Sequence, residues 1–567
     1  MPMPLRLALS LAAATLLALP AAANAGHTSD PRTPNLVPLG HIEEPAVLGG
    51  FGGAEPDIHT DIAFRGRYAI QGNWDGFNIR DISNPAAPTT VSRTFCEGNQ
   101  GDVLVYRNVV VRSWNTPAGT PGAFGAALTC DGQDVEEGFE GLHVFDISNL
   151  GNPELVAQVP TPCGSHTATA VPDPANNRLL VYDNPSSGSE GCAGFAVVSI
   201  PLDAPQNAAM LRHEDLATPE GAPGTYQCHD MSVFLAVRLA ACAGGPGFSV
   251  WSLGGARGGS LEDPELLYQV PVPTVSVGHS TAFSWDGKII VFGHEPGGGI
   301  AAECEATDHP LKRSLFFYRA SDGVLLGTWT LPRPQLGTEN CTIHNFNVVP
   351  YLDRHVLVHG SYQSGTSVVD FTSPSAAREI AWSDPPPRVP AEGSPFCSDT
   401  GGCDVGGAWS SYWYNDRIYE TNINEGLNIF RLAEPWANRA LELPYLNPQT
   451  QERIMSCTVQ AQGAALRARR ASEVHVIARV RGWNQGAPAV RVRLLGPGIG
   501  RTLRTNGAGE AMVTLRPTRA GTLRITVRAT LNMQGCSTSR RVARAATAGA
   551  GTGGAGTGGA GLTGRSR

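Results

Sequence analysis

Residues 68–88 of this chain read YAIQGNWDGFNIRDISNPAAP, and they contain two short β-type segments and the turn that follows them. The segment that opens at Gly76 is apolar at alternate positions, which is the pattern of a half-buried strand, and YAIQG is a second strand-like segment before it. The Asn-Pro pair after Asp-Ile-Ser is a turn signal. The stretch therefore predicts a unit of antiparallel β-structure.

This strand type recurs along the chain. Seven copies begin at Gly76, Gly141, Gly194, Gly247, Ser314, Gly365 and Gly426. Each copy is preceded by two further β-type segments, and six copies are followed by a fourth, such as ELVAQV. A four-stranded unit repeated in this way is typical of a β-propeller, in which each repeat forms one blade.

The seventh copy has no fourth segment after it, but an unpartnered strand-like segment lies at the other end of the chain, NLVPLGHI, Asn35 to Ile42. A propeller ring closes when an N-terminal strand completes the last blade, because no sheet edge then stays unpaired. The sequence therefore predicts an all-β protein, a seven-bladed β-propeller closed by an N-terminal strand. An open sandwich or a solenoid is the alternative, and neither explains the position of this segment.

The same motifs resemble a known family. YAIQGNWDGFNIRDISNPAAP and GLHVFDISNLGNPELV are similar to LVIVD-repeat proteins, a group of extracellular β-propellers of mostly undefined activity. The likeness covers roughly residues 35–435 and fades in the fifth and seventh repeats, where Asp-Ile-Ser is absent. The resemblance implies a propeller fold and a secreted setting, and it implies no reaction.

The N-terminus has the features of a secretory signal peptide. Arg6 precedes an apolar run, residues 7–19, and the Ala-Asn-Ala of residues 23–25 is a small-residue cleavage motif. We expect residues 1–25 to be removed, and the run is too short for a transmembrane segment. The chain has 12 Cys and no C-x-x-C pair, which favours disulfides in an exported protein over metal thiolates. The predicted location is extracellular or cell-wall associated.

The residue composition and the charge of the chain change along its length, and these changes suggest domain boundaries. We expect the propeller to span residues 26–446, a linker 447–456, an immunoglobulin-like β-sandwich 457–545 and a disordered Gly/Ala/Thr-rich tail 546–567. Residues 457–545 carry 16 arginines, no lysine and two acids, whereas the preceding part is acidic. A basic module suits an anionic cell-wall polymer, or the acidic body itself. It has no stacked aromatics of the kind that bind nucleic acid.

Most of the cysteines map to one face of the predicted propeller, where the loops into the first strands and the loops between second and third strands lie; we call it the top face. Pairing of nearest neighbours would staple this face and close the C-terminal module, although sequence alone does not fix connectivity. The expected pairs are Cys96–Cys130, Cys163–Cys192, Cys228–Cys242, Cys304–Cys341, Cys397–Cys403 and Cys457–Cys536.

Five histidines each open the first strand of a repeat: His59, His166, His229, His279 and His344. The first strands of blades surround the propeller axis, so we expect the five imidazoles to converge at the top mouth of the channel. Neutral imidazole binds Fe, Cu and Zn, which makes a divalent transition metal the predicted cofactor. A structural role is equally open, since the Gly-His of WD-type repeats hydrogen-bonds within its own blade.

Acids and aromatic residues near these histidines could support the ligands or contact a bound molecule. They are Asp61, Asp102, Asp230, Glu295, Trp74 and Trp409, and further candidates in the same loops are Asp75, Trp114, His294 and Glu425. The insertion 115–140 ends in Asp134, Glu136, Glu137 and Glu140, which could cover the mouth as a lid or bind Ca²⁺. A solvated acidic loop is the simpler interpretation of that insertion.

Two hypotheses about function remain. The chain has no P-loop, HExxH, GxSxG or dinucleotide fingerprint, which favours a secreted or cell-envelope binding protein that presents a His-lined pocket to a small ligand or polymer. The alternative is a metal-dependent enzyme, an oxidoreductase or a lyase or hydrolase, whose ion is held by the histidines.

Overall fold

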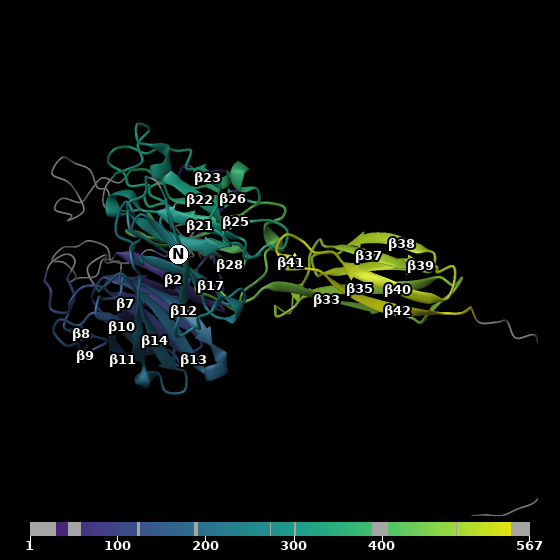
Figure 1. The fold of residues 1–567 in the computed structure, drawn as a ribbon, viewed down its shortest axis with the longest axis horizontal. Helices are drawn as coiled ribbons and strands as arrows, with labels where there is room; N and C mark the ends of the chain where they lie inside the picture. Colours follow the sequence, from purple (N-terminus) through teal and green to yellow (C-terminus); the bar gives the residue numbers. More distant parts are fainter. Residues whose placement is uncertain are drawn as a thin grey trace, which may run out of the picture. The chain divides into compact units, whose positions relative to one another are not determined.

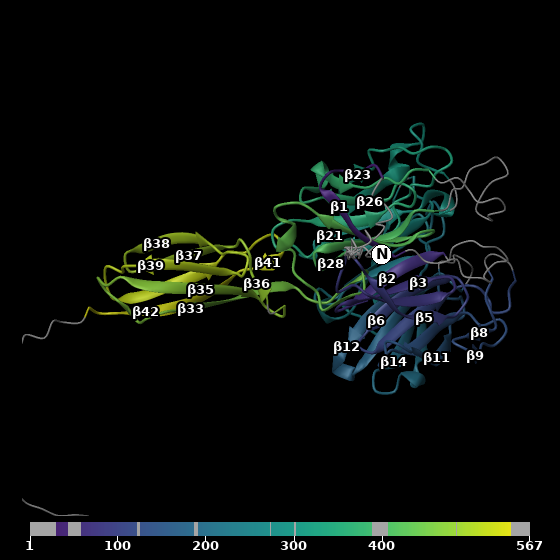
Figure 2. The same ribbon diagram turned by 180° about the vertical axis from the view of Figure 1, so that it is seen from behind.

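The computed structural model describes residues 30–42, 58–121, 125–185, 191–272, 274–299, 302–387, 406–483 and 485–545. These residues form strands and short 3-10 turns and contain no α-helix, so the predicted all-β class is confirmed. The chain splits into two compact units, Met1–Arg453 and Ile454–Arg567 (Figures 1 and 2). The expected signal peptide, the Gly-rich tail and the pair Cys397–Cys403 fall outside the described residues.

The described strands of the first unit form seven sheets with four antiparallel strands each, two of which gain one short extra strand, and one separate two-stranded hairpin. We call the first-named strand of each sheet below its inner strand. The sheets are β2–β5 (His59–Arg65, Tyr68–Asn73, Gly76–Asp81, Thr89–Phe95); β6, β7, β10 and β11 (Gln100–Tyr106, Val109–Trp114, Gly141–Asp146, Glu154–Pro160); β12–β15 (Thr167–Asp173, Arg178–Asn184, Gly194–Pro201, Ala209–Asp215); β16–β19 (Asp230–Phe234, Leu239–Gly244, Gly247–Ser252, Glu265–Pro271); β20–β23 (Gly278–Phe283, Ile289–His294, Ser314–Arg319, Leu325–Thr330); β24–β27 (Phe346–Val348, Val356–Gly360, Thr366–Asp370, Arg378–Trp382); and β28–β30 with β1 (Ala408–Tyr414, Arg417–Asn422, Gly426–Leu432, Leu36–Ile42).

The recurring glycine at the start of the third strand has a steric cause. Gly76 and Gly141 have φ values of 145° and 142°. A Cβ atom at either position would overlap a carbonyl oxygen of the neighbouring outer strand, that of Thr94 and that of Val159 respectively. Glycine alone adopts this backbone without strain, which explains why the motif begins with it.

N-terminal strand β1 pairs antiparallel with β30, from Leu36 opposite Leu432 to Ile42 opposite Leu427. The inner strands also pack against one another: β2 against β6 and β28, β12 against β6 and β16, and β20 against β16 and β24. Strand β24 packs against β28 as well. Every inner strand therefore has an inner strand of another sheet on each side.

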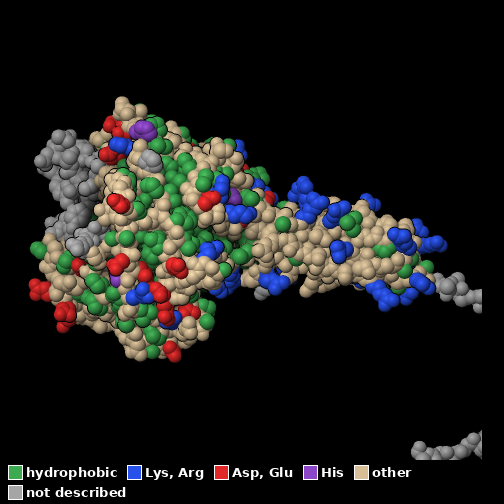
Figure 3. Space-filling view, in the orientation of Figure 1, with side chains coloured by type: hydrophobic (Ala, Val, Ile, Leu, Met, Phe, Trp, Pro, Cys, Tyr) green, Lys and Arg blue, Asp and Glu red, His purple; other side chains and the backbone are tan. Residues whose placement is uncertain are grey.

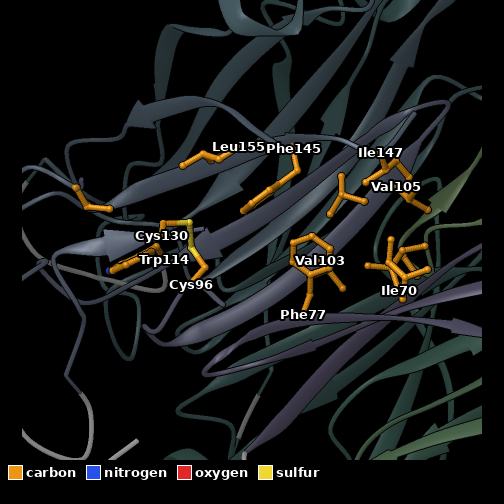
Figure 4. Packing of buried hydrophobic residues seen from close by; sticks show 14 of the residues in the cluster. Ile70, Phe77, Cys96, Val103, Val105, Trp114, Cys130, Phe145, Ile147 and Leu155 are labelled. Atoms are coloured by element: carbon orange, nitrogen blue, oxygen red, sulfur yellow. A yellow bond between two sulfur atoms is a disulfide. The ribbon is translucent and has the colours of Figure 1, made fainter. Parts of the chain in front are cut away.

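Apolar side chains fill the space between the sheets. In the first two, Ile70 and Phe77 pack with Val103 and Phe145, and the rings of Phe77 and Phe145 meet edge to face with centroids 4.9 Å apart (Figure 4). All four are at most 2% exposed. Burial of such side chains stabilises the fold by about 1.5–3 kcal/mol each.

Five disulfides are present among the described residues. They join Cys96 to Cys130, Cys163 to Cys192, Cys228 to Cys242, Cys304 to Cys341 and Cys457 to Cys536. The first four lie in the first unit; Cys242 is part of strand β17, and Cys130 lies in the small hairpin of β8 (Thr129–Cys130) and β9 (Gln133–Asp134).

The chain crosses several inner strands before it leaves the first unit. Strand β31 (Tyr445–Leu446) pairs with β2, and β32 (Thr450–Gln451) runs parallel to β16. Between them, the side chain of Asn447 hydrogen-bonds to the backbone N–H and C=O of Val105 in β6. Residues 447–451, which the sequence assigned to a linker, are therefore built into the first unit.

The second unit consists of two sheets. One contains β36 (Gln485–Gly486), β35 (Ser472–Val480), β33 (Met455–Gln462), β41 (Met533–Gln534) and β39 (Glu510–Leu515); the other contains β34 (Leu466–Arg467), β42 (Cys536–Ala543), β40 (Gly521–Val527), β37 (Arg491–Gly496) and β38 (Ile499–Arg504). Strand β33 packs against β40 and β42, and the bond Cys457–Cys536 joins the two sheets. No helix in the described part of the chain is long and apolar enough to cross a membrane.

Candidate functional site

A cavity of about 350 Å³ lies where the inner strands begin. Each inner strand contributes one side chain within two residues of its start, in chain order Ile58, Gln100, His166, His229, His279, His344 and Trp409. The loops between second and third strands add Trp74, Asn115, Glu295 and Tyr362. The repeat thus gathers side chains that are far apart in sequence around one space.

Four of the five expected histidines line this cavity in succession. The ring centroids are 4.4 Å apart for His166 and His229, 4.1 Å for His229 and His279, and 4.2 Å for His279 and His344. The fifth, His59, is not among the lining residues, because the register of β2 places its neighbour Ile58 there. Successive residues of a strand face opposite sides, so His59 is turned away. Its ring is fully buried, and burial lowers its pKa to about 3.

Glu295 contacts two of these histidines. Its Oε1 lies 3.5 Å from Nε2 of His344, and its Oε2 lies 3.9 Å from Nε2 of His279. The hydroxyl of Tyr362 donates a 2.5 Å hydrogen bond to Oε1. Burial raises the pKa of Glu295 to about 7. His229, His279 and Glu295 each offer one potential ligand atom, and these atoms all lie within 4.8 Å of one another, so the group could hold a metal ion.

The imidazoles are held in the neutral form that binds metals. Burial lowers the pKa of His344 to about 3 and that of His166 to about 4, and it lowers the pKa values of His229 and His279 well below the usual range. Nδ1 of His344 lies 2.8 Å from the carbonyl oxygen of Trp409, which can only accept. Nδ1 therefore carries the proton, and the lone pair of Nε2 faces Glu295.

The histidines differ in how their nitrogens are used. Both nitrogens of His166 lie near side-chain amides, Nδ1 3.0 Å from Asn115 and Nε2 3.3 Å from Gln100. In contrast, Nδ1 of His229 is buried and has no hydrogen-bond partner among the described residues. A buried polar atom without a partner destabilises the folded state, and an ion bound to this nitrogen would supply the missing partner. His229, His279 and Glu295 are the residues of the cavity that could hold a metal ion, and His344 lies next to them.

The other expected residues divide between the cavity and its surroundings. Glu295, Trp74 and Trp409 line it, whereas Asp61, Asp102 and Asp230 do not. These three carboxyls are at most 7% exposed, and burial raises the pKa values of Asp102 and Asp230 well above normal. Asp61 accepts hydrogen bonds from Ser410 at 2.6 Å and from Gln449 at 3.1 Å.

The remaining candidates do not line the cavity. Trp114 is fully buried, and Nε2 of His294 lies 2.7 Å from the carbonyl oxygen of Leu311. Burial raises the pKa of Asp75 to about 6. The acids of the 115–140 insertion are exposed or half-buried and form no close ligand group within the described residues, so the Ca²⁺ hypothesis gains no support. A second close group, Cys96, Cys130 and His143, offers no thiolate because its cysteines are bonded to each other.

Sequence reasoning missed Tyr362. It follows β25, at the start of the loop between the second and third strands of the sixth sheet, and its backbone has φ of 43°. Its ring packs against His344 with centroids 4.6 Å apart. The signal that could have found it is its place in a loop of the top face, beside the start of the sixth inner strand.

Comparison with known proteins identifies the repeat. The family model described as LVIVD repeat matches residues 59–94 and 138–161. The chain carries LVIVD repeats. Together with the succession of four-stranded antiparallel sheets, these repeats assign a β-propeller fold to the first unit.

Among solved structures, the chain is similar to Kuenenia stuttgartiensis hydrazine synthase (11% identity, 65% of this chain and 93% of that chain covered, TM-score 0.42). It is also similar to a chain of a mitotic checkpoint complex (9%, 75% and 99%, 0.40) and to the C-terminal WD40 domain of Sif2 (8%, 69% and 98%, 0.33). None of the curated proteins compared with the chain matches it. Similarity at this level says nothing about activity.

Proposed function

We propose that the first unit is a seven-bladed β-propeller closed by β1, exported from the cell, and followed by an immunoglobulin-like β-sandwich. Support for closure comes from the pairing of β1 with β30 and from the packing of β28 against β2. Support for export comes from the five disulfides, which persist in oxidising compartments.

The propeller holds a divalent transition metal (Fe, Cu or Zn) in its axial cavity and presents it to a small ligand. The observation that carries this function is the approach of the donor atoms of His229, His279 and Glu295 to within 4.8 Å of one another at a cavity of about 350 Å³. A bound ion would supply a Lewis-acid or redox centre. The protein supplies neutral imidazoles and a proton-bearing Nδ1 on His344 that orients its ring.

Metal analysis tests this function. Purified protein is loaded with Zn²⁺, Cu²⁺ or Fe²⁺ in turn, desalted and measured by mass spectrometry of the metal. We expect one ion per chain, lost in His229→Ala and in His279→Ala and retained in His309→Ala, whose side chain is exposed. Thermal unfolding of the metal-free variants checks that they fold. Wild-type protein without stoichiometric metal, or both cavity variants with it, would contradict the proposal.

A metal-dependent enzyme is the second candidate, and Glu295 favours it. Its pKa near 7 and its hydrogen bond from Tyr362 are properties of a group that exchanges protons at neutral pH. In this second candidate the histidines alone hold the ion, and Glu295, which then does not bind the metal, is the general base. Turnover of a candidate substrate that is lost in Glu295→Gln while the metal stays bound would establish the enzyme, whereas unchanged turnover would exclude this role for Glu295.

A further inference from the structure

The arginines of the second unit are concentrated on one of its two sheets. The strands of the sheet β34-β42-β40-β37-β38 carry eight arginines and no acid. The strands of the other sheet carry one arginine and both acids of residues 457–545, Glu473 and Glu510. In the view of Figure 3, Lys and Arg dominate the charged side chains over the second unit.

On strands β37, β38, β40 and β42, five of these arginines share the outer face of the sheet. In β37, Val492 and Leu494 are buried and the residues between them are exposed, so the exposed set points outward. Residues directly opposite one another on paired strands share a face, and the register extends this set across the sheet. The set contains Arg491, Arg493, Arg504, Arg524 and Arg541, and we call this surface the arginine face.

The charges on the arginine face are not neutralised within the described chain. None of the five guanidinium groups forms an ion pair with a described residue, and both acids of this unit, Glu473 and Glu510, lie on strands of the other sheet. Arg491 and Arg504 lie directly opposite each other, an arrangement that is destabilising for like charges. Binding of anions to this face would remove that repulsion.

The side chains between the arginines suggest the kind of anion. Thr502 and Thr526 flank Arg493, and Ser539 lies opposite Arg524. Hydroxyls of this kind both donate and accept hydrogen bonds, as sugar hydroxyls do. The one aromatic residue of 457–545, Trp483, is 8% exposed, so the face has no platform on which nucleic-acid bases could stack.

We propose that the arginine face binds a linear acidic polysaccharide. Arginine forms paired hydrogen bonds with carboxylate, sulfate and phosphate groups, and neighbouring arginines on the face are spaced about 5 Å across strands and about 7 Å along them. A chain of acidic sugars can therefore meet several guanidinium groups in succession. The face would hold the exported protein at an acidic wall or matrix, and it does so whether or not the cavity of the first unit binds a metal.

Binding of the full-length protein to immobilised glycans tests this proposal. Alginate supplies carboxylates, heparin supplies sulfates as well, dextran is the neutral control, and duplex DNA supplies phosphates without free sugar hydroxyls. Binding is measured by biolayer interferometry over a salt series. We expect alginate and heparin to bind, dextran not to bind, and DNA to bind more weakly than either acidic glycan at equal salt.

Two matched triple variants separate the arginine face from net charge. The first combines Arg491→Gln, Arg493→Gln and Arg524→Gln. The second combines Arg470→Gln, Arg481→Gln and Arg519→Gln, which are exposed and lie outside the strands of the sheet. We expect the first to weaken glycan binding roughly 10- to 100-fold and the second by less than about threefold.

Equal losses in the two triple variants would overturn the proposal, because net charge alone would then explain binding. So would tighter binding of DNA than of the glycans, or no glycan binding at physiological salt. The variant His229→Ala is expected to bind glycan as the wild type does, so that failure of the metal site and failure of the arginine face give different results.

Discussion

The closure of the propeller by its N-terminal strand can be tested at Leu36. This side chain is 0% exposed and packs in a cluster with Val356, Val358 and Phe430, and its partner across the sheet is Leu432. Replacement of a fully buried leucine by alanine removes its transfer free energy and leaves a cavity, which together cost about 2–5 kcal/mol. Leu36→Ala should therefore lower the free energy of unfolding of the first unit by that amount if β1 is docked in solution.

Equilibrium unfolding in guanidinium chloride, followed by tryptophan fluorescence, measures this loss. Hydrogen exchange of residues 426–432 gives a local readout, because β30 loses its cover when β1 detaches. The control is Val91→Ala on β5, where the side chain is 37% exposed and the expected cost is below about 0.5 kcal/mol. A cost for Leu36→Ala no larger than for this control, with unchanged exchange of β30, would show that β1 does not close the ring.

Three further results are expected. Burial raises the pKa of Asp183 from 3.8 to about 7, so the folded protein binds a proton at this carboxyl more tightly than the unfolded chain does and loses stability as pH rises between those values. In denaturant titrations, Asp183→Asn should therefore be more stable than wild type at pH 8, by up to about 4 kcal/mol, and the difference should vanish near pH 4. His59→Asn should keep full metal content, in contrast to His229→Ala, because Ile58 occupies the cavity wall in its place; loss of metal in both would refute the assignment of the ligands. Tyr362→Phe removes the hydrogen bond to Glu295 and should raise the pKa of that carboxyl further, which infrared titration of the carboxyl band can detect; an unchanged pKa would mean that the bond does not hold the ionised form.

The strand order could be predicted from sequence because local signals specify it. At Gly76 and at Gly141, alternating apolar residues follow a glycine whose backbone conformation only glycine adopts without strain. Each such copy marks the third strand of a sheet and, with it, the strand before it. The pairing of β1 with β30 followed from a missing strand at one end of the chain and an unpartnered one at the other. The convergence of His166, His229, His279 and His344 followed from their common place at the start of inner strands.

The parts that escaped prediction depend on tertiary register. A shift of one residue exchanges Ile58 and His59 between the cavity and the interior of a blade, and no local pattern reports such a shift. Residues 447–451 look like a loop, with Asn and Pro at their start, and their two-residue strand at Thr450 exists because the inner strand β16 offers it backbone partners. Tyr362 follows a strand of the sixth sheet and bonds to Glu295, which follows a strand of the fifth sheet; the repeated motif does not predict this contact.

The distribution of side chains around the cavity bears on what it can hold. The sheets that contribute histidine are the third to the sixth in chain order, so the imidazoles and Glu295 occupy one continuous side of the wall. The seventh and the first sheet contribute Trp409, Ile58 and Trp74 instead, and the second contributes amides. In the function proposed above, an ion would lie on the histidine side of the cavity, and a small organic ligand would lie against the aromatic and amide groups on the other side.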